Sequence, residues 1–329
     1  MVTVLDVQDL RTYLPTKKGI VKAVDGVSFH IDEGEIIGIA GESGCGKTET
    51  MLSIVQLIQP PGKIMSGRVI IDDEDILQLK ANSPGMRSVR GRKMSFIFTD
   101  PKTSLNPTLA IGRQITEVLE THLDMDKQAA RERTVELLDM VGVPDAGARM
   151  DDRPFQFSNG MRQRVMIAMA LACNPMVVIT DEPTNVADIT TKSQLLELMK
   201  GLVSGLNTSL IITTQNLGML TRYARRVYVM YAGRIVESGP TAVVFNNPCH
   251  PYTLGLLRSV PRLGVNKSIK KLNPLLGLTP DLIDMPPHCA FLPRCTYKTE
   301  RCEREPWPDM RPVGEDHQIR CYVDLREIP

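Results

Sequence analysis

Short apolar runs of the kind that form buried strands alternate along the chain with segments whose apolar residues recur at helical spacing. The apolar runs occupy residues 35–41, 176–180 and 209–215. After the first run, apolar residues at positions i, i+3, i+4 and i+7 predict one face of a helix, formed by Met51, Ile54, Val55 and Ile58. Strands that alternate with helices favour a mainly parallel sheet covered on both faces. The pattern therefore predicts an α/β fold.

The order of the remaining segments predicts how the chain is organised. The N-terminal stretch alternates apolar and polar positions like a strand, and residues 227–239 have the pattern of a hairpin. A mostly helical block precedes the second apolar run, and Pro becomes frequent beyond residue 240. We therefore expect a main domain, a helical subdomain inserted in it and a C-terminal extension, at residues 1–260, about 95–175 and 261–329.

The composition is that of a globular protein without a strong electrostatic bias. The 329 residues are 42% hydrophobic and 23% charged, with a formal net charge of +1. A nearly neutral chain is not a nucleic-acid binder held by bulk electrostatics. No run approaches 18 apolar residues, and the N-terminal stretch lacks a basic region followed by an apolar one. We therefore expect neither a membrane span nor a secretory signal.

A glycine-rich segment between the first apolar run and the first helix has the chemistry of a phosphate-binding loop. Residues 41–48, GESGCGKT, fit the pattern G-x-x-x-x-G-K-[ST], and a glycine-rich turn that arose by chance is the alternative. Glycines allow successive backbone N–H groups to point at a phosphate, and the following helix presents its N-terminus to the same anion. We expect Lys47 to reach the β- and γ-phosphates of a bound nucleotide and Thr48 to bind Mg²⁺. The other residues expected at this phosphate site are Gly41, Ser43, Gly44, Cys45 and Gly46.

Two adjacent carboxylates end the second apolar run. In VVITDEPT the run leads directly into Asp181 and Glu182. Adjacent like charges at the end of a buried strand are costly unless a cation or a reacting group meets them. Because ligands of open parallel sheets bind beyond the carboxyl ends of the strands, we expect these acids at the same crevice as the loop. Asp181 would hold Mg²⁺ and Glu182 would orient or deprotonate the attacking water; the alternative is a pair that caps the helix starting near Asp188.

Several segments of the sequence resemble those of a known protein family. With DEPT, the segment QFSNGMRQRVMIAMALACNP at 156–175 resembles the signature region of the nucleotide-binding subunits of ABC transporters. The segments at 96–115, 250–261 and 289–302 resemble the dipeptide/oligopeptide/nickel permease ATPases, and the resemblance covers nearly the whole chain. It implies a P-loop NTPase (RecA-like) fold with a parallel-sheet core, an antiparallel β N-terminal part, a helical subdomain insertion and a small Cys-rich, metal-bound C-terminal extension.

The resemblance also implies a site shared between two subunits. In this family two ATPase subunits pair head to tail, and the loop of one faces the signature of the other across a sandwiched ATP. The signature residues that would contact the partner's ATP are Ser158, Asn159, Gly160 and Met161. Asp188 would belong to the D-loop. Tyr13 would lie against adenine, and its alternative role is that of a half-buried strand residue.

Several positions depart from the family pattern, among them the D-loop, which is NVAD at 185–188 where the family commonly has TALD. The Q-loop Gln, which touches Mg²⁺ and the attacking water, aligns with the shorter Thr99, and the switch His aligns with Gln215. Gln215 can donate a hydrogen bond but carries no charge. The first signature Gly is Asn159, which adds bulk where phosphate should approach the backbone. Since the loss of a positioned catalytic group costs about 10²–10⁴-fold in rate, we expect slow hydrolysis at this chain's own site and a faster site on a partner; neutral drift, or rescue by water, is the alternative.

Four of the seven cysteines lie within 33 residues near the C-terminus. They are Cys289, Cys295, Cys302 and Cys321, separated by 5, 6 and 18 residues. In a cytosolic protein such a group favours a metal over disulfides, although the spacing is not the C-x₂-C of zinc ribbons. The resemblance implies a [4Fe–4S] cluster, with Zn²⁺ or four unligated thiols as alternatives. We expect the metal to act as a structural staple for a segment too short to build its own core.

With the resemblance, these features predict an ATPase subunit that energises a membrane importer for di- or oligopeptides, peripheral on the cytoplasmic face of the cell membrane. The expected cofactors are ATP, Mg²⁺ and the cluster. The expected partners are a second ABC ATPase subunit, two transmembrane permease subunits and, indirectly, an extracytoplasmic solute-binding protein, with no nucleic acid. The alternatives are a nickel or metal-chelate importer, a pseudo-ATPase that clamps nucleotide without turnover, a soluble ABC protein of repair or translation, and a redox enzyme built on the cysteines.

Overall fold

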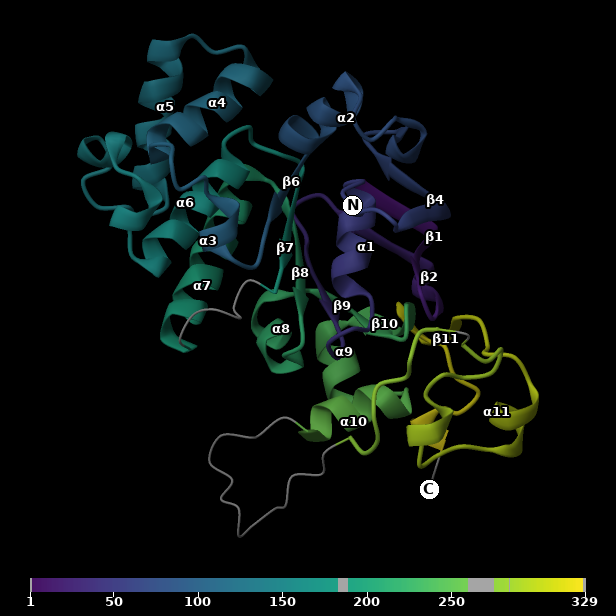
Figure 1. Ribbon diagram of the computed structural model, residues 1–329. Coiled ribbons are helices and arrows are strands. Elements are labelled where there is room, and N and C mark those ends of the chain that lie inside the picture. The colour runs from purple at the N-terminus through teal and green to yellow at the C-terminus, as the bar shows by residue number, and fades with distance from the viewer. Residues whose placement is uncertain (1, 183–188, 260–274, 284, 328–329) are drawn as a thin grey trace. The chain divides into compact units, whose positions relative to one another are not determined.

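The computed structural model describes residues 2–182, 189–259, 275–283 and 285–327 (Figure 1). The chain divides into two compact units that interleave along the sequence. The first unit comprises Met1–Leu5, Ile31–Glu35 and Ile71–Ile212. The second unit comprises Asp6–His30, Ile36–Ile70 and Thr213–Pro329. The domain boundaries inferred from sequence composition stay a prediction.

The first unit is mainly helical. Its helices are α2 (Pro84–Ser88), α3 (Pro101–Ser104), α4 (Ile111–Leu123), α5 (Lys127–Met140), α6 (Asn159–Leu171) and α7 (Ile189–Leu206). Short 3-10 turns lie at Ile76–Gln78, Ala148–Asp151 and Pro154–Gln156, and a π-helical segment lies at Val89–Lys93. The strands are β5 (Glu74–Asp75), β6 (Met94–Ile97) and β7 (Val177–Asp181). β6 and β7 run parallel, with Met94 opposite Val177 and Ile97 opposite Thr180.

Helices α4, α5 and α6 pack together because each buries an apolar face, and they form one teal group in Figure 1. In α4 the buried residues Ile111, Ile115 and Leu119 are spaced four apart, which places them on one side of the helix. The chain thus forms a helical block here, as the pattern predicts. β6 is the exception, since its four residues form a strand through pairing with β7. Pairing of this kind is decided by tertiary context rather than by local sequence.

The second unit contains parts of two sheets. In one, β1 (Thr3–Thr16) lies between β2 (Gly19–Asp32) and β4 (Lys63–Ile71), and a two-residue turn makes β1 and β2 an antiparallel pair. In the other, the order is β11 (Arg311–Gly314), β12 (His317–Ile319), β10 (Arg234–Pro240), β9 (Arg226–Tyr231) and β3 (Ile36–Ala40). β3 runs parallel to β9, whereas the other pairs are antiparallel, so this sheet is mixed. β8 (Ser209–Thr214) passes from the first unit into the second.

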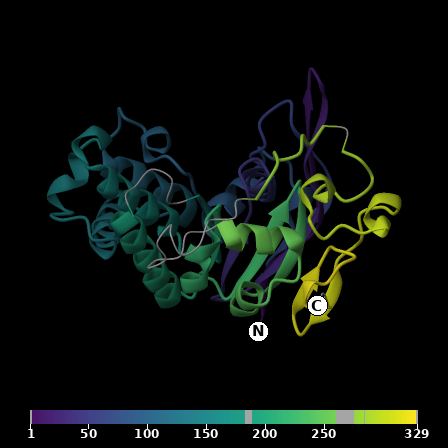
Figure 2. The same ribbon diagram turned by 90° about the horizontal axis from the view of Figure 1, so that it is seen from below.

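Short helices and the C-terminal hairpin complete the second unit. The helices are α1 (Lys47–Ile54), α8 (Leu217–Tyr223), α9 (Thr241–Asn246), α10 (Pro251–Ser259) and α11 (Glu300–Arg304), with 3-10 turns at Leu292–Arg294 and Leu325–Glu327. Figure 2 shows β11 and β12 as a yellow hairpin close to the C-terminus. β12 pairs with β10, with Glu237 opposite Ile319. The C-terminal segment therefore extends the sheet that contains β3.

Helix α1 is shorter than its apolar spacing predicts. It ends at Ile54, and Val55 is its C-cap. Gln56 then has a φ of 50°, a left-handed conformation that does not continue a helix. Ile58, expected on the helix face, therefore lies beyond the helix. Throughout the described part of the chain, no helix combines the length and the apolar character needed to cross a membrane.

Candidate functional site

The predicted phosphate-binding loop connects the fully buried strand β3 to helix α1. Helix α1 begins at Lys47, and its N-cap Gly46 has a φ of 103°. A Cβ atom on Gly46 would lie 2.0 Å from the carbonyl oxygen of Ala23, and one on Gly41 would lie 2.3 Å from that of Met230. Both positions therefore require glycine. The strand–loop–helix order of a phosphate cradle is present.

The side chain of Lys47 is directed into this loop. It is 3% exposed, and its Nζ donates to the carbonyl oxygens of Gly41 (3.0 Å) and Glu42 (2.9 Å). Ser43 and Gly44 are exposed. The N-cap Gly46 has no side chain that could cap the first turn of α1, so this N-terminus is suited to an anion. An ammonium group held by loop carbonyls beside a helix N-terminus fits the phosphates of ATP.

Cys45 and Thr48 have different surroundings. Cys45 is buried, and burial raises the pKa of its thiol to about 11, so the thiol is neutral at pH 7 and a poor nucleophile. Thr48 is half-buried in the first turn of α1, at the position expected of a Mg²⁺ ligand. Its predicted co-ligand Asp181 belongs to the first unit. The shared Mg²⁺ site therefore stays a prediction.

The acids lie at the end of the parallel pair β6–β7 in the first unit. Asp181 is the last residue of β7 and is 6% exposed, and Glu182 follows it with a φ of 42°. Thr99 follows β6, and its hydroxyl donates to the carbonyl oxygen of Asp181 at 3.0 Å. The structure thus brings Thr99 to the acids, as expected where parallel strands end at one edge. The hydrogen bond to the Asp181 carbonyl uses the single hydroxyl hydrogen of Thr99.

Gln215 directly follows β8. Within the second unit, the N–H of Gly41 donates to the carbonyl oxygen of Thr214 at 3.3 Å. The end of β8 therefore lies beside the start of the phosphate loop. The Gln215 side chain is exposed there and offers an amide without charge. Its catalytic role stays a prediction.

The signature residues begin helix α6. Ser158 is the N-cap, and its Oγ accepts a hydrogen bond from the N–H of Met161 at 3.2 Å. Ser158 and Asn159 are exposed, and Gly160 and Met161 are half-buried. The segment is therefore accessible at the N-terminus of a 13-residue helix. Asp188, the predicted D-loop residue, lies outside the described residues.

Tyr13, the predicted adenine contact, is half-buried on β1. Its hydroxyl donates to Asp25 at 2.9 Å, and Asp25 also accepts from Arg11 (2.7 Å) and Arg234 (2.6 Å). Burial, and then the hydrogen bond to Asp25, raise the pKa of Tyr13. This network fixes the hydroxyl end of the side chain. The contact of the ring with adenine stays a prediction.

The four C-terminal cysteines converge on one pocket. Its lining includes Cys289, Cys295, Cys302, Cys321, His250 and Phe291. All four cysteines are free thiols. Burial raises the pKa of Cys289 to about 11 and that of Cys321 to about 12. Because a bound cation displaces such protons, this set of sulfur donors suits a thiophilic metal.

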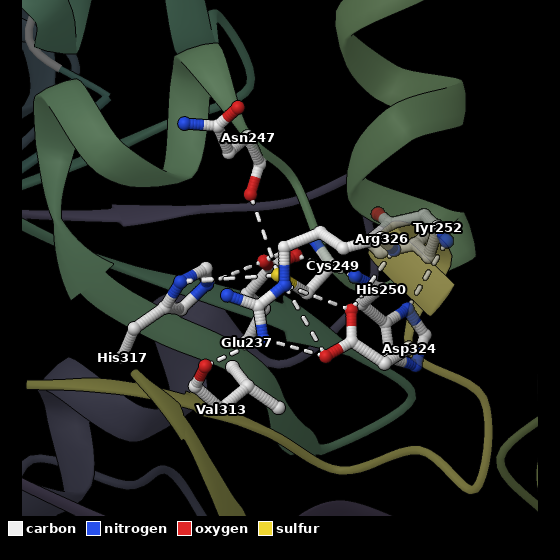
Figure 3. Close-up of polar contacts among 9 residues, drawn as sticks. All are labelled: Glu237, Asn247, Cys249, His250, Tyr252, Val313, His317, Asp324 and Arg326. Carbon is white, nitrogen blue, oxygen red and sulfur yellow. Dashed lines mark hydrogen bonds and ion pairs between the residues drawn. The ribbon is translucent and has the colours of Figure 1, made fainter. Parts of the chain in front are cut away.

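A second buried cluster joins β10 to β12 (Figure 3). Glu237 Oε1 accepts from the Cys249 N–H (2.7 Å) and from His317 Nε2 (2.8 Å), and Oε2 accepts from the His250 N–H (3.1 Å). We call this arrangement the Glu237 clasp; no local pattern predicts it, since Glu237 and His317 are 80 residues apart. Within the described residues, the ligand atoms of Glu237, Cys249 and His317 lie close enough to suggest a metal site. His317 directs Nε2 at Glu237 and Nδ1 toward Cys249 Sγ, 3.9 Å away, so an ion bound to Glu237 would meet His317 at Nε2 and not at Nδ1. In the structure, hydrogen bonds to Glu237 hold the cluster together as a clasp.

A phosphate loop between strand and helix, with an acid at the end of a parallel strand, defines a P-loop nucleoside triphosphatase. Residues 24–185 match the ABC transporter family, and residues 236–302 match the oligopeptide/dipeptide transporter C-terminal region. The chain is 45% identical over 324 residues to the oligopeptide transport ATP-binding protein AppD of Bacillus subtilis, covering 98% of this chain and 97% of that protein. It is 43% identical over 323 residues to the dipeptide transport ATP-binding protein DppD of Haemophilus influenzae, covering 98% and 96%. The chain therefore belongs to the ABC transporter family, in the branch of oligopeptide and dipeptide transport ATP-binding proteins.

Solved structures share this fold. The dimeric ATP-binding cassette MJ0796 in a post-hydrolysis state matches with a TM-score of 0.64 and 26% identity, over 72% of this chain and 98% of that one. The protein cbiO1 of Clostridium perfringens matches with a TM-score of 0.63 and 25% identity, over 75% and 92%. The P-loop NTPase fold is thus confirmed as an ABC cassette with mixed sheets. The chain is an ABC-type ATPase.

Proposed function

We propose that this chain is the ATP-binding subunit that energises a membrane importer of di- or oligopeptides. The observation that carries the proposal is the similarity of almost the whole chain, C-terminal region included, to proteins named for oligopeptide and dipeptide transport. The loop around Lys47 and the acids Asp181 and Glu182 support ATP hydrolysis as the source of energy. A nickel or metal-chelate importer is the alternative.

In the proposed assembly this chain pairs head to tail with a second ATPase subunit. The pair lies on the cytoplasmic face of the cell membrane, against two permease subunits that an extracytoplasmic binding protein supplies. Exposure of Ser158 and Asn159 at the start of α6 supports contact with a partner's nucleotide. In the first unit, Phe98 and Phe155 are 44% and 66% exposed, and exposed aromatic residues suit contact with a membrane subunit.

Within this pair, the slower site is the one on this chain's own loop. Thr99 uses its hydroxyl hydrogen on the carbonyl of Asp181 and is too short to replace a glutamine that reaches the attacking water. Gln215 has no group that titrates. Because Glu182 keeps its carboxylate, the site still hydrolyses ATP. The loss of one positioned group slows this hydrolysis by about 10²–10⁴-fold. A subunit that clamps nucleotide without turnover is the limiting case.

ATP turnover by the assembled transporter tests this assignment. Glu182→Gln in this chain is compared with the matching substitution in the partner ATPase. We expect Glu182→Gln to leave most turnover intact and the partner's substitution to abolish it. Complete loss with Glu182→Gln alone contradicts the asymmetric assignment. Uptake of peptide rather than of nickel by reconstituted vesicles tests the substrate class.

We also propose that the cysteine pocket binds a [4Fe–4S] cluster as a structural staple. The support is a buried donor in the pocket wall. His250 is 1% exposed, burial lowers its pKa to about 4, and its Nδ1 accepts from the Tyr252 N–H at 3.0 Å, so Nε2 carries the hydrogen. Within the described residues, Nε2 forms no hydrogen bond of normal geometry, although the Arg320 backbone acts on the pKa of the ring. A thiolate or sulfide bound in the pocket would accept this hydrogen bond.

The spacing of the thiols favours the cluster over zinc. Structural zinc sites typically take pairs of cysteines two to four residues apart in the sequence. The four cysteines of the pocket are instead separated by 5, 6 and 18 residues. A cluster with one thiolate per iron distributes its four ligands over four metal ions.

Metal analysis of anaerobically purified protein tests the proposal. We expect about four iron atoms and four acid-labile sulfides per chain, and their loss in Cys295→Ala. Cys173→Ala, which changes a buried cysteine outside the pocket, is the matched control and should retain both. Zinc in place of iron, or no metal in freshly purified protein, would contradict the cluster.

A further inference from the structure

Glu42 of the phosphate loop forms a bidentate ion pair with Arg294 of the cysteine-rich segment. Arg294 Nη1 lies 2.7 Å from Glu42 Oε2, and Nη2 lies 2.9 Å from Oε1. Two parallel bonds of this kind fix orientation as well as distance. The Arg294 side chain is 3% exposed and the Glu42 side chain 24% exposed, so the pair is largely shielded from salt. Because Arg294 directly precedes Cys295, the pair joins the ATP site to the wall of the thiol pocket.

Arg294 is also fixed on its other sides. Its Nε donates to the carbonyl oxygen of Leu276 at 3.0 Å, and Nη1 donates to the hydroxyl of Tyr231 at 3.4 Å. The guanidinium lies 5.8 Å from the ring centroid of Tyr231 and 5.9 Å from that of Phe291, within the range of cation–π attraction. The two N–H groups that face Glu42 are therefore presented in one orientation.

Glu42 is held through its backbone as well. Its N–H donates to the hydroxyl of Tyr252 at 2.9 Å, and its carbonyl oxygen accepts from Lys47 Nζ at 2.9 Å. The carboxylate, the N–H and the carbonyl of Glu42 thus all have partners. One of these partners is the lysine of the phosphate-binding motif. A shift of Glu42 would therefore displace Lys47.

The negative charge of Glu42 explains why this loop needs the ion pair with Arg294. An unpaired carboxylate in a loop that binds phosphate would repel a triphosphate, most strongly where water is excluded. Burial lowers the pKa of Arg294, but the hydrogen bonds to Glu42 outweigh it, and the pKa is raised overall. Arg294 therefore stays cationic and neutralises Glu42.

We propose that Arg294 is a positioning residue of the ATP site, which neutralises Glu42 and fixes the phosphate loop from the C-terminal segment. Nucleotide affinity then depends on a residue far outside the part of the chain that matches the ABC transporter family, 24–185. Since Arg294 does not reach the reacting atoms, its loss changes Kd and KM more than kcat.

Titration calorimetry of MgATP with the purified chain tests the proposal, together with KM and kcat of the assembled transporter. Arg294→Gln leaves Glu42 unpaired, and we expect binding to weaken about tenfold, within the range of coupling between sites. Arg294→Lys keeps the charge but loses the two parallel N–H donors of the guanidinium, and we expect binding to weaken about threefold. Arg304→Gln is the matched control, since Arg304 belongs to the same segment and pairs with Glu300 at 78% and 82% exposure. It should bind like the wild type.

The decisive variant is Glu42→Gln combined with Arg294→Gln. It removes both charges and with them the repulsion, so we expect MgATP binding to recover to within about threefold of the wild type. If Arg294 only held the fold together, the double variant would bind no better than Arg294→Gln. That result overturns the proposal, as does binding by Arg294→Gln within about twofold of the wild type, or a fall in kcat without a change in KM.

Thermal unfolding without nucleotide separates misfolding from an effect at the site. If Arg294→Gln does not fold, the charge-balanced double variant carries the test alone. Binding close to that of the wild type supports the proposal. A double variant that fails to fold, or folds and fails to bind, overturns it.

Discussion

Thr99 donates its hydroxyl hydrogen to the backbone carbonyl oxygen of Asp181, at 3.0 Å, where the parallel strands β6 and β7 end. The short side chain thus bonds to the end of β7, and we expect that a glutamine at this position would extend past it. The strands and both acids remain in place around this substitution. The scaffold of the site is therefore present, and the proposal that Thr99 slows hydrolysis concerns the reach of one side chain.

If Thr99 and Gln215 limit hydrolysis as proposed, substituting both by the residues expected of the family should accelerate hydrolysis at this chain's own site. Thr99→Gln combined with Gln215→His supplies a group that reaches the attacking water and one that carries charge. We expect turnover to rise about 100-fold, the lower end of what one positioned catalytic group contributes. The measurement is steady-state ATP hydrolysis by the assembled transporter with the partner's catalytic carboxylate removed.

The control for this prediction is Thr108→Gln, which lengthens an exposed threonine away from the strand ends. It should leave turnover unchanged. An unchanged rate in the Thr99→Gln/Gln215→His variant would mean that these two positions do not limit the site.

Lys47 should be needed for nucleotide binding and much less for folding. Lys47→Met fills a similar volume at a site that is 3% exposed. It removes the charge-assisted bonds to phosphate, worth about 1.5–3 kcal/mol each, so we expect MgATP to bind about 100-fold more weakly. Calorimetry gives the affinity and thermal unfolding gives the stability. Lys18→Met, at an exposed position, should bind normally; unaltered affinity in Lys47→Met would contradict the loop assignment.

Elements with a continuous apolar run were predictable from the sequence. The runs at 35–41, 176–180 and 209–215 correspond to β3, β7 and β8, whose residues are all buried. Strands buried on both faces lose the alternation of half-exposed strands, so the run itself is the signal. β6 gave no such signal, because its strand state comes from pairing with β7.

Motif spacing likewise predicted the phosphate loop, since the backbone geometry of a cradle demands glycine and lysine at fixed positions. Contacts between distant segments left no such trace. Arg294 meets Glu42 across 252 residues, and His317 meets Glu237 across 80. Neither pair has a period or a local partner, so only the folded chain reveals them.

Gly46 should tolerate no side chain. In Gly46→Ala the new Cβ would lie 2.0 Å from the carbonyl oxygen of Ala23, at a φ of 103°. The backbone strain alone costs about 1–2 kcal/mol, and the clash adds to it, so we expect a loss of at least about 3 kcal/mol in the free energy of unfolding. Urea unfolding measures this loss.

Gly44 provides the matched control for Gly46. It also has a positive φ, 74°, but a Cβ there meets nothing within 4 Å. Gly44→Ala should therefore cost only the backbone strain, about 1 kcal/mol. Equal losses in both variants would show that the contact with Ala23 does not constrain the loop.

The Glu237 clasp should be needed to hold the C-terminal hairpin on the sheet. Glu237→Leu leaves the N–H groups of Cys249 and His250 without their acceptor in a site that is 0% exposed. An unsatisfied buried donor costs about 1–3 kcal/mol, so we expect a loss of about 2–6 kcal/mol. The single Trp, Trp307, lies in the C-terminal segment and reports its unfolding in urea by fluorescence.

Two further variants separate the clasp from a general effect of removing a carboxylate. His317→Phe removes one donor to Glu237 and leaves the two backbone bonds, so its loss should be smaller than that of Glu237→Leu. Glu303→Leu removes a carboxylate that is 52% exposed in the same segment and should leave the unfolding midpoint unchanged. If Glu237→Leu unfolds at the urea concentration of Glu303→Leu, the C-terminal hairpin is held by its strand pairing with β10 and not by Glu237.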